Sequence, residues 1–311
     1  MDKIICVVGP TASGKTKLAV ALAKAYDGEV VSCDSMQLYR HMDIGTAKPT
    51  KEEMDGVRHH MIDVAEPDEP FSVGKYVELA DRCVQDILSR GKTVIVAGGT
   101  GLYAESLIAG RSFAPVASGE QRAALEQQLR EEGAQAMLER LRQIDPQTAA
   151  RLHPADEKRI VRALEVYAQT GKTLSQHDAD SRAQPPRYEA LWLGLDYEDR
   201  AVLYRRIDAR VEQMLQLGLL GEVQELMQRG ISPRATAMQA IGYKEFFAVA
   251  QGECTLQEAV ALVKQRSRNY AKRQLTWLRR NAQLQWLRLT GEEDFDTIFA
   301  AARQKIPFFA G

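Results

Sequence analysis

The stretch Gly9-Pro10-Thr11-Ala12-Ser13-Gly14-Lys15-Thr16 decides the fold of this protein. It matches the pattern G-x-x-x-x-G-K-[ST], the phosphate-binding loop (P-loop) that joins a strand to a helix. A strand is predicted before it, over the apolar, largely β-branched run of residues 3–8. A helix is predicted after it, over residues 15–26, because small and apolar side chains recur there at helical spacing.

This loop predicts the binding of a diphosphate. Its glycines let backbone N–H groups turn toward phosphate oxygens, and the N-terminus of the following helix adds positive potential. We expect the Lys15 ammonium to reach the terminal phosphate and the Thr16 hydroxyl to hold Mg²⁺. The alternative is a structural glycine-rich turn with an exposed lysine, and the loop alone does not identify the reaction.

Further strands extend this unit into an α/β fold. Apolar runs at residues 30–33, 61–64, 93–97, 191–195 and 286–289 are candidate strands, separated by helix-period sequence. Short buried strands in this order predict a parallel sheet flanked by helices, in a P-loop NTPase-like arrangement. Residues 121–176 carry little strand signal, and Gln184-Pro185-Pro186 is typical of an exit linker. We therefore expect a core of residues 1–112 and 188–311 that carries an all-helical insertion domain, residues 113–187.

Composition excludes several classes of protein. The 311 residues include 41 Lys and Arg against 42 Asp and Glu, which excludes a uniformly basic nucleic-acid coat. The four cysteines form no C-x-x-C pair, which argues against a disulfide scaffold or a zinc finger and favours a reducing cytosol. No apolar run approaches the ~18 residues of a membrane span, and residues 4–8 are too few for a signal-peptide core. We expect a soluble, cytoplasmic enzyme that has no membrane partner.

Asp34 is the candidate catalytic acid. P-loop hydrolases usually have a Mg²⁺-holding Asp at a strand end, but the run 93–97 leads into Gly98-Gly99-Thr100-Gly101 without a carboxylate. Asp34 follows the second expected strand, and an acid at that position is expected next to the P-loop, at the carboxyl edge of the parallel sheet where ligands bind. Alone, Asp34 is equally compatible with a helix N-cap, whereas together with Ser35 and Gln37 it becomes a candidate base. Group transfer is therefore favoured over nucleotide hydrolysis.

Eight motifs, in this order, resemble the tRNA dimethylallyltransferase family, also called the tRNA isopentenyltransferases. They are GPTASGKT at 9–16, DSMQLYR at 34–40, GTAKP at 45–49, HHMID at 59–63, GGTGLY at 98–103, RIVRALE at 159–165, IGYKE at 241–245 and KRQLTWLR at 272–279. The resemblance covers nearly the whole chain. It is to the bacterial form, since the C-terminal zinc finger of the eukaryotic members has no counterpart here.

The resemblance implies transfer of a dimethylallyl group from dimethylallyl diphosphate to N6 of adenosine 37, in tRNAs that read codons beginning with U. It implies that the P-loop, often described as an ATP site, holds the donor's diphosphate, that Mg²⁺ assists and that the enzyme is a monomer. Asp34 matches the family's proposed base, and Arg210 matches an arginine expected near the diphosphate. Thr100 is expected opposite Asp34, in contact with the extruded nucleotide, although its glycine-rich turn is also compatible with a structural role.

The resemblance also implies which residues contact the anticodon stem-loop. In the core these are Asp34, Ser35, Met36, Gln37 and Thr100, and on the insertion they are Arg122, Lys158, Arg159, Ile160, Val161 and Arg162. Beside the anticodon nucleotides they are Met238, Gln239, Ala240, Ile241, Gly242 and Tyr243. On a basic helix they are Lys272, Arg273, Gln274, Leu275, Thr276, Trp277, Leu278 and Arg279.

The basic helix stands out in the sequence itself. From Lys264 to Arg288 there are eight basic residues and no acid, and one charge sign interleaved with aromatic residues is typical of phosphate contact. Helical spacing predicts a core stripe of Ala271, Leu275, Leu278 and Ala282 and turns Tyr270 and Trp277 away from it, with Arg266, Arg273 and Arg280. The alternative is a basic helix that covers the core and has no partner. For the basic residues of 158–162, the alternative is ionic pairing with Asp156, Glu157 and Glu165.

His59 and His60 suggest a metal site only at first sight. Adjacent residues on an extended segment point to opposite sides, and no third ligand has zinc-binding spacing. We therefore prefer hydrogen bonding in a loop.

Two other functions are compatible with part of the sequence. A P-loop kinase acting on a small metabolite accounts for the loop and the insertion but not for the acid-free basic helix. A non-catalytic RNA-binding protein accounts for that helix but gives no role to Asp34, Lys15 and Thr16.

Overall fold

The computed structural model describes residues 1–114 and 119–306. The chain divides into two compact units, one formed by Met1–Ile108 and Arg187–Gly311 and the other by Ala109–Pro186. The limits expected from the sequence for the insertion, residues 113 and 187, lie four residues and one residue after the observed limits, residues 109 and 186. Residues 115–118 and 307–311 of the expected ranges are outside the described residues.

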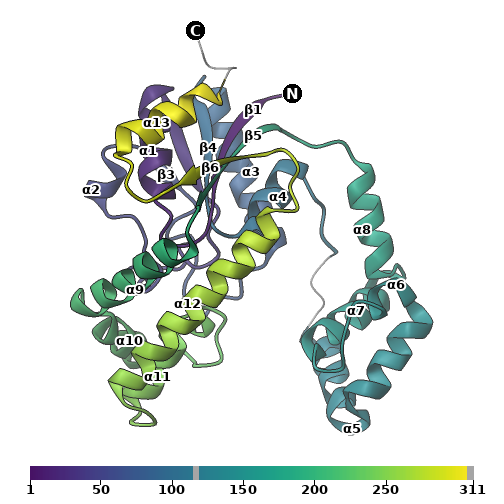
Figure 1. Cartoon of the computed structure of the whole chain (residues 1–311). Coiled ribbons are helices and arrows are strands. Elements are labelled where there is room, and N and C mark those ends of the chain that lie inside the picture. The colour runs from purple at the N-terminus through teal and green to yellow at the C-terminus, as the bar shows by residue number, and fades with distance from the viewer. Residues whose placement is uncertain (115–118, 307–311) are drawn as a thin grey trace. The chain divides into compact units, whose positions relative to one another are not determined.

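The first unit, the core, is built on a six-stranded parallel sheet in the order β3-β2-β4-β1-β5-β6 (Figure 1). The strands are β1 (Lys3–Val8), β2 (Gly28–Ser32), β3 (His59–His60), β4 (Thr93–Gly98), β5 (Glu189–Tyr197) and β6 (Leu284–Leu289). This confirms the parallel α/β sheet expected from the sequence. β4 pairs with both β2 and the P-loop strand β1 and lies between them, and Asp34, which follows β2, still lines the same cavity as Lys15 and Thr16 of the P-loop.

Alternating side chains of the strands form two apolar cores, one on each face of the sheet. Ile4, Cys6 and Val8 of β1 belong to the core on one face, and Ile5 and Val7 belong to the core on the other. The helices of this unit are α1 (Lys15–Ala25), α2 (Lys51–Met54), α3 (Val73–Ser89), α4 (Gly101–Ala109), α9 (Arg200–Gln216), α10 (Leu219–Gln228), α11 (Tyr243–Ala250), α12 (Leu256–Leu278) and α13 (Phe295–Gln304), with a short 3₁₀ turn at Ala237–Gln239. Buried residues of α3 and α4 pack on the first face, and those of α1 and α13 pack on the second.

Two local expectations are wrong. The strand predicted over residues 61–64 ends at His60, because Met61 and Asp63 have φ angles of 62° and 55°, which break an extended run. The predicted core stripe of the basic helix stops at Leu278, where α12 ends, so that Ala282 is exposed rather than buried. The other expected strands are present within a few residues of their expected limits.

The second unit is helical in its described part. It contains α5 (Gly119–Ile144), α6 (Pro146–Ala149), α7 (Glu157–Thr170) and α8 (Leu174–Ala183), and α5 is interrupted at Gly133, whose φ is 83°. Asp145 caps α6 by accepting a hydrogen bond from Thr148 N, which explains the helix break at Asp145-Pro146. Buried residues of α5, α6 and α7, among them Leu138, Leu141 and Ile160, form a separate apolar core.

Among the described residues, no helix is long and apolar enough to cross a membrane. All four cysteines are free thiols, and Cys6 and Cys33 are buried. His59 bonds the Val57 carbonyl oxygen, and His60 bonds Glu29 at 2.7 Å, so both histidines have hydrogen-bond partners within the core.

Candidate active site

The P-loop connects β1 to α1 and has the backbone geometry that its glycines predict. Gly14 has φ 91° at the N-cap of α1, a conformation that L side chains rarely adopt. Gly9 lies so close to β5 that a Cβ there would be 2.7 Å from the Leu195 carbonyl oxygen. Arg206 of α9 donates to the Ala12 carbonyl oxygen at 3.0 Å, which ties the loop to a second element. The predicted strand–loop–helix unit is thus present and anchored on both sides.

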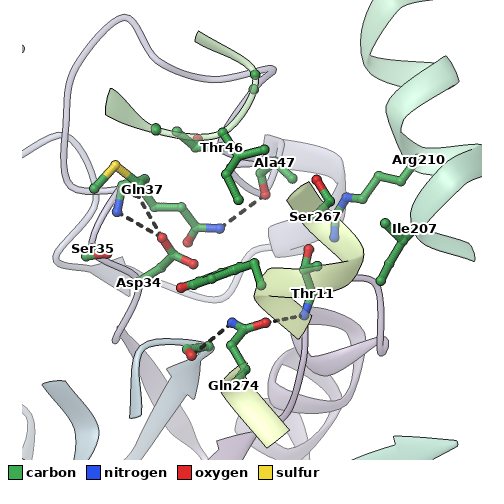
Figure 2. Close-up of a pocket in the computed structure, with 18 of the residues that line it drawn as sticks. Thr11, Asp34, Ser35, Gln37, Thr46, Ala47, Ile207, Arg210, Ser267 and Gln274 are labelled. Carbon is green, nitrogen blue, oxygen red and sulfur yellow. Dashed lines mark hydrogen bonds between the residues drawn. The ribbon is translucent and has the colours of Figure 1, made fainter. Parts of the chain in front are cut away.

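A cavity of about 460 Å³ opens in front of this loop, and its volume lies within the usual range for ligand sites. It is lined by residues from distant parts of the chain (Figure 2). Of the expected site residues, the cavity brings together Thr11, Lys15, Thr16, Asp34, Ser35, Met36, Gln37, Arg210, Gln239, Ala240, Ile241, Gly242, Arg273 and Gln274. Among the apolar lining residues, α9 contributes Ile207, Val211 and Met214 and α12 contributes Val263.

Asp34 is held in place by its own backbone turn. Its Oδ1 accepts hydrogen bonds from Met36 N at 2.9 Å and Gln37 N at 3.4 Å, the pattern of an Asx turn. The residues that follow form a turn and not a helix, so the helix N-cap alternative does not apply. Within the described chain, no hydrogen bond reaches Oδ2. Asp34 therefore presents one free carboxylate oxygen at the cavity wall.

Two cations face the same cavity. Burial and the neighbouring Arg210 guanidinium lower the pKa of Lys15 to about 8, against the opposing effect of Asp34. Burial also lowers the pKa of Arg210, which forms no hydrogen bond or ion pair with any described residue. The Lys15 ammonium donates to the Pro10 carbonyl oxygen at 2.7 Å. A nearby anion stabilises half-buried cations of this kind, and a diphosphate group is such an anion.

The glycine-rich turn after β4 has a structural role, because the missing side chains of its glycines leave room for helix α12 to pack against it. A Cβ on Gly99 would be 2.2 Å from Gln274 Nε2, and one on Gly101 would be 2.3 Å from Trp277 Cδ1. Gln274 is buried, donates to the Gly99 carbonyl oxygen and accepts from Thr11 N, each at 2.9 Å. It therefore links α12, the turn and the P-loop, as Figure 2 shows.

Thr100 bonds to the protein and does not line the cavity. Its Oγ1 accepts from Ser35 N at 3.1 Å and lies 3.3 Å from Ser35 Oγ, beside Asp34. Tyr270 of α12 is also hydrogen-bonded to the Thr100 side chain, and burial, with a smaller contribution from Asp34, raises the pKa of Tyr270 to about 12. The ring of Tyr270 lines the cavity, although helical spacing alone turns it away with the exposed arginines. Sequence reasoning missed this residue.

The positive charge of the basic helix is partly neutralised in the structure by acids that are distant in the sequence. Acids from other elements pair with three of its cations: Lys264 with Glu212, Arg266 with Glu245, and Arg268 with Asp208. Arg279 and Arg288 share the buried Asp196, at 3.4 and 3.2 Å. Among the described residues, only a cation–ring contact is found for Lys272, Arg273 and Arg280, over Tyr204, Tyr270 and Trp277 respectively.

Several residues expected to contact tRNA are buried. Leu275 and Leu278 of α12 lie in the cores of the sheet, and Met238 and Tyr243 lie behind the cavity wall. In the insertion, Ile160 and Val161 are part of its apolar core. The exposed or half-exposed expected residues on α12 and at its C-cap are Lys272, Arg273, Thr276, Trp277 and Arg279. Leu275, Leu278, Ile160 and Val161 thus pack in apolar cores beneath the surface, whereas the buried Gln274 lines the cavity.

In the insertion, the expected ionic pairing is present for part of the basic set. Arg162 pairs with the buried Glu165 at 2.6 Å, and Arg159 pairs with Asp156 at 3.7 Å. Arg122 pairs with Glu126 at 3.0 Å, and Lys158 is exposed. Lys158, Arg159 and Arg122 thus retain solvent-facing charge in this unit.

Two helices, α9 and α12, each line the cavity with residues that recur at helical spacing in the sequence. On α9 they are Ile207, Arg210, Val211 and Met214, and on α12 they are Val263, Ser267, Tyr270 and Gln274. The α9 set follows the spacing i, i+3, i+4, i+7 and the α12 set follows i, i+4, i+7, i+11, and both spacings place the residues on one face of a helix. Each mixes polar and apolar side chains, which is why a search for an apolar stripe does not find them.

A family model described as IPP transferase matches residues 37–281 of this chain. The tRNA dimethylallyltransferase of Acetivibrio thermocellus is 46% identical over 298 residues, which cover 96% of this chain and 94% of that protein. The tRNA dimethylallyltransferase of Geobacter sulfurreducens is 49% identical over 300 residues, 96% of each chain.

Solved structures agree with these sequence relatives. The full-length tRNA isopentenylpyrophosphate transferase from Bacillus halodurans is 42% identical with a TM-score of 0.74, and the match covers 99% of this chain and 97% of that one. A eukaryotic dimethylallyltransferase, described as acting on tRNA, matches with a TM-score of 0.85 at 29% identity, over 97% of this chain and 78% of that one. This chain belongs to the IPP transferase family, together with the bacterial tRNA dimethylallyltransferases.

Proposed function

We propose that this protein transfers a dimethylallyl group from dimethylallyl diphosphate to N6 of adenosine 37 in tRNAs that read codons beginning with U. The observation that carries the proposal is a single cavity that contains the P-loop residues Lys15 and Thr16, Arg210 and the Asp34 carboxylate. The names of the relatives, tRNA dimethylallyltransferases and an enzyme acting on tRNA, point to the same reaction.

The reaction forms a bond between N6 and the primary allylic carbon and breaks the bond from that carbon to the diphosphate oxygen. N6 loses one proton, and the leaving diphosphate takes the bonding electron pair. An adenine amino group is a poor nucleophile, so a carboxylate that accepts this proton contributes about 10²–10⁴-fold to the rate. The free Oδ2 of Asp34 suits this role because Oδ1 is already held by two backbone N–H groups.

Negative charge that develops on the leaving oxygen needs fixed positive partners. The P-loop backbone N–H groups, the Lys15 ammonium and the Arg210 guanidinium supply them from one side of the cavity. Both cations are held in a partly desolvated environment, which strengthens their interaction with an anion. The apolar side chains Ile207, Val211 and Met214 would keep water from the allylic carbon.

The site also suits a magnesium ion that is bound mainly by its substrate. Thr16 contributes a hydroxyl oxygen to the cavity, and the described residues contain no cluster of three or more His, Cys, Asp or Glu side chains with metal-binding geometry. Mg²⁺ commonly takes few protein ligands together with phosphate oxygens and water. When bound, the ion would neutralise part of the diphosphate charge, with Thr16 as its protein ligand.

The target adenine must leave the anticodon loop to reach the cavity, at a cost of a few kcal/mol. We propose that the exposed cations of α12, with Lys158, Arg159 and Arg122 of the insertion, bind the anticodon stem-loop, and that Gln239–Gly242 approach the unstacked nucleotides. In this proposal the insertion is a separate tRNA-contacting domain, and the enzyme acts as a cytoplasmic monomer.

The test is to incubate the purified protein with unmodified tRNA, Mg²⁺ and labelled dimethylallyl diphosphate, without ATP. We expect label on adenosine 37, identified as dimethylallyladenosine after nuclease digestion. A kinase would form no labelled tRNA in this assay and would transfer the γ-phosphate in a parallel assay with labelled ATP, and a binding protein would retain tRNA without forming product in either assay. Either of those outcomes, with an active family enzyme as the control, would exclude the proposed transfer.

A further inference from the structure

Two irregular segments form one wall of the cavity. The 43–47 loop contributes Gly45, Thr46 and Ala47, and the 239–242 segment contributes Gln239 to Gly242. No strand runs through either segment, so their positions must be fixed by other contacts. Figure 2 shows Gln37 hydrogen-bonded to Ala47, beside Thr46.

One carboxylate, Glu222 of α10, holds the 43–47 loop. Its Oε2 accepts from Asp43 N and Ile44 N, both at 2.8 Å, and its Oε1 accepts from Gly45 N at 3.1 Å. Three consecutive backbone N–H groups that converge on one anion form a nest, and bonds to an ionised acceptor are stronger than neutral ones. The loop conformation therefore depends on a charged side chain that is 177–179 residues away in the sequence.

The same carboxylate holds the second segment. The Tyr243 hydroxyl donates to Glu222 Oε1 at 2.6 Å. Tyr243 directly follows the 239–242 segment and is fully buried, and burial together with Glu222 raises its pKa well above the usual value, so the hydroxyl stays protonated. A Cβ on Gly45 would be 2.5 Å from the Tyr243 ring, so loop and ring also pack directly against each other.

The 43–47 loop leads to the proposed base. The Ala47 carbonyl oxygen accepts from Gln37 Nε2 at 3.1 Å, and Gln37 N bonds Asp34 Oδ1. A shift of the loop would therefore displace Gln37 and loosen the turn that orients Asp34. Lys15 of the P-loop and Arg210 of α9 have no hydrogen bond to this network in the described residues.

We propose that Glu222 is a positioning residue that joins the two segments and thereby shapes the nucleotide side of the cavity. The inference rests on the proposed function, because it assigns the 43–47 loop and the 239–242 segment to the tRNA substrate and the P-loop to the prenyl donor. Glu222 touches neither substrate; it acts through the backbone of the loop and through Tyr243.

The test compares Glu222→Gln with Glu225→Gln. The first variant replaces one acceptor oxygen by an NH₂ group that faces backbone donors, whereas Glu225 is exposed on the same helix and pairs only with Arg229 among the described residues. We expect Glu222→Gln to raise the KM for tRNA about tenfold and to lower kcat about tenfold, the effect of losing bonds to a charged group. The affinity for dimethylallyl diphosphate should stay within about twofold of wild type, because the P-loop has no hydrogen bond to the Glu222 network in the described residues.

Hydrogen exchange separates this role from a general loss of stability. The amides of Asp43, Ile44 and Gly45 should exchange faster in Glu222→Gln and normally in Glu225→Gln. Tyr243→Phe, which keeps the three backbone bonds and removes only the hydroxyl, should raise the tRNA KM with little effect on these amides. If the two glutamate variants share wild-type kinetics and exchange, or if donor binding falls together with tRNA binding, the assignment is overturned. A wild-type protein without transferase activity would contradict the proposed function, whereas the exchange experiment would still decide whether Glu222 holds the loop.

Discussion

At the scale of single residues, the cavity combines groups with opposite requirements. In the proposed reaction Asp34 accepts a proton while Lys15 and Arg210 hold an anion, and all three line one cavity. Asp34 keeps one oxygen free because its turn satisfies the other, and burial together with the nearby Arg210 lowers the pKa of Lys15. These properties lead to two predictions.

Asp34→Asn should lower single-turnover transfer by about 10²–10⁴-fold, because the amide keeps the size of the side chain but cannot take a proton. Binding of tRNA should stay within about twofold of wild type, since phosphate contacts supply most of that affinity. Rapid-quench kinetics and filter binding measure the two quantities. Asp86→Asn, on the exposed side of α3, serves as the control. Near-normal turnover in Asp34→Asn would exclude Asp34 as the base.

The affinity of the free enzyme for diphosphate should fall as the pH rises through about 8. Burial and Arg210 lower the Lys15 pKa from 10.5 to about 8, so the ammonium is charged below this value and neutral above it. Calorimetric titration with inorganic pyrophosphate on both sides of pH 8 measures the effect. In Lys15→Arg the guanidinium stays charged, so this transition should disappear. An affinity that is constant through pH 8 in the wild type would contradict the role of Lys15.

At the scale of elements, α12 determines much of the site. One of its faces lines the cavity through Ser267 and Tyr270, and Gln274 ties it to the P-loop. This approach is possible because the turn after β4 lacks side chains where the helix passes. Lys272 and Arg273 of α12, and Arg280 just after it, are cations that have no acidic partner among the described residues.

Gly99→Ala should destabilise the protein by about 1–3 kcal/mol, the usual cost of overpacking, because its Cβ would be 2.2 Å from Gln274 Nε2. The change should also weaken diphosphate binding, since displacement of Gln274 releases Thr11 N of the P-loop. Urea unfolding and pyrophosphate titration measure these effects. Gly221→Ala is the matched control, because nothing lies within 4 Å of a Cβ there and alanine favours the helix. Equal stability of both variants would contradict the packing argument.

Lys272→Ala combined with Arg280→Ala should weaken tRNA binding and reduce the slope of log affinity against log salt by about 1.5 units, if each cation contacts one phosphate. Both lie on α12 or directly after it and have only ring contacts among the described residues. Thr276→Ala is exposed on the same helix and removes no charge, so its slope should match the wild type. An unchanged slope in the double variant would mean that tRNA binds elsewhere.

At the scale of the whole molecule, the insertion leaves and re-enters the core at one point. The Ile108 carbonyl oxygen accepts from Arg187 N at 3.0 Å and from Tyr188 N at 3.2 Å. Tyr188 is buried, and its hydroxyl donates to Asp81 of α3 at 2.5 Å. The two chain ends of the first unit are therefore held together where the insertion begins and ends. The insertion has a separate apolar core.

Replacing residues 109–186 by a short glycine–serine linker should leave the core folded, because its two ends are already hydrogen-bonded to each other. Pyrophosphate affinity should be retained, whereas tRNA affinity should fall strongly because the cations of the insertion are lost. Circular dichroism, thermal unfolding and the two binding assays test this. Wild-type tRNA affinity in the shortened protein would remove the insertion from the tRNA-binding surface.

Much of the core could be predicted from the sequence because its signals are local. The P-loop and the strands at residues 3–8, 93–97 and 191–195 depend on a few neighbouring residues, and the motifs carried a family resemblance over nearly the whole chain. Residues 61–64 failed as a strand because two non-glycine residues adopt positive φ angles, which an apolar run does not reveal.

Family membership and the strand–loop–helix unit of the P-loop were thus determined by the sequence alone, since glycine positions and alternating side chains act within a few residues. The tertiary structure decided the rest: it placed β4 between β1 and β2, turned Tyr270 into the cavity, and supplied acids from α9 and α11 to the basic helix. It also joined Glu222 to a loop about 180 residues away in the chain. Such partners depend on how whole elements pack, and no local pattern of side chains encodes which distant group will meet them.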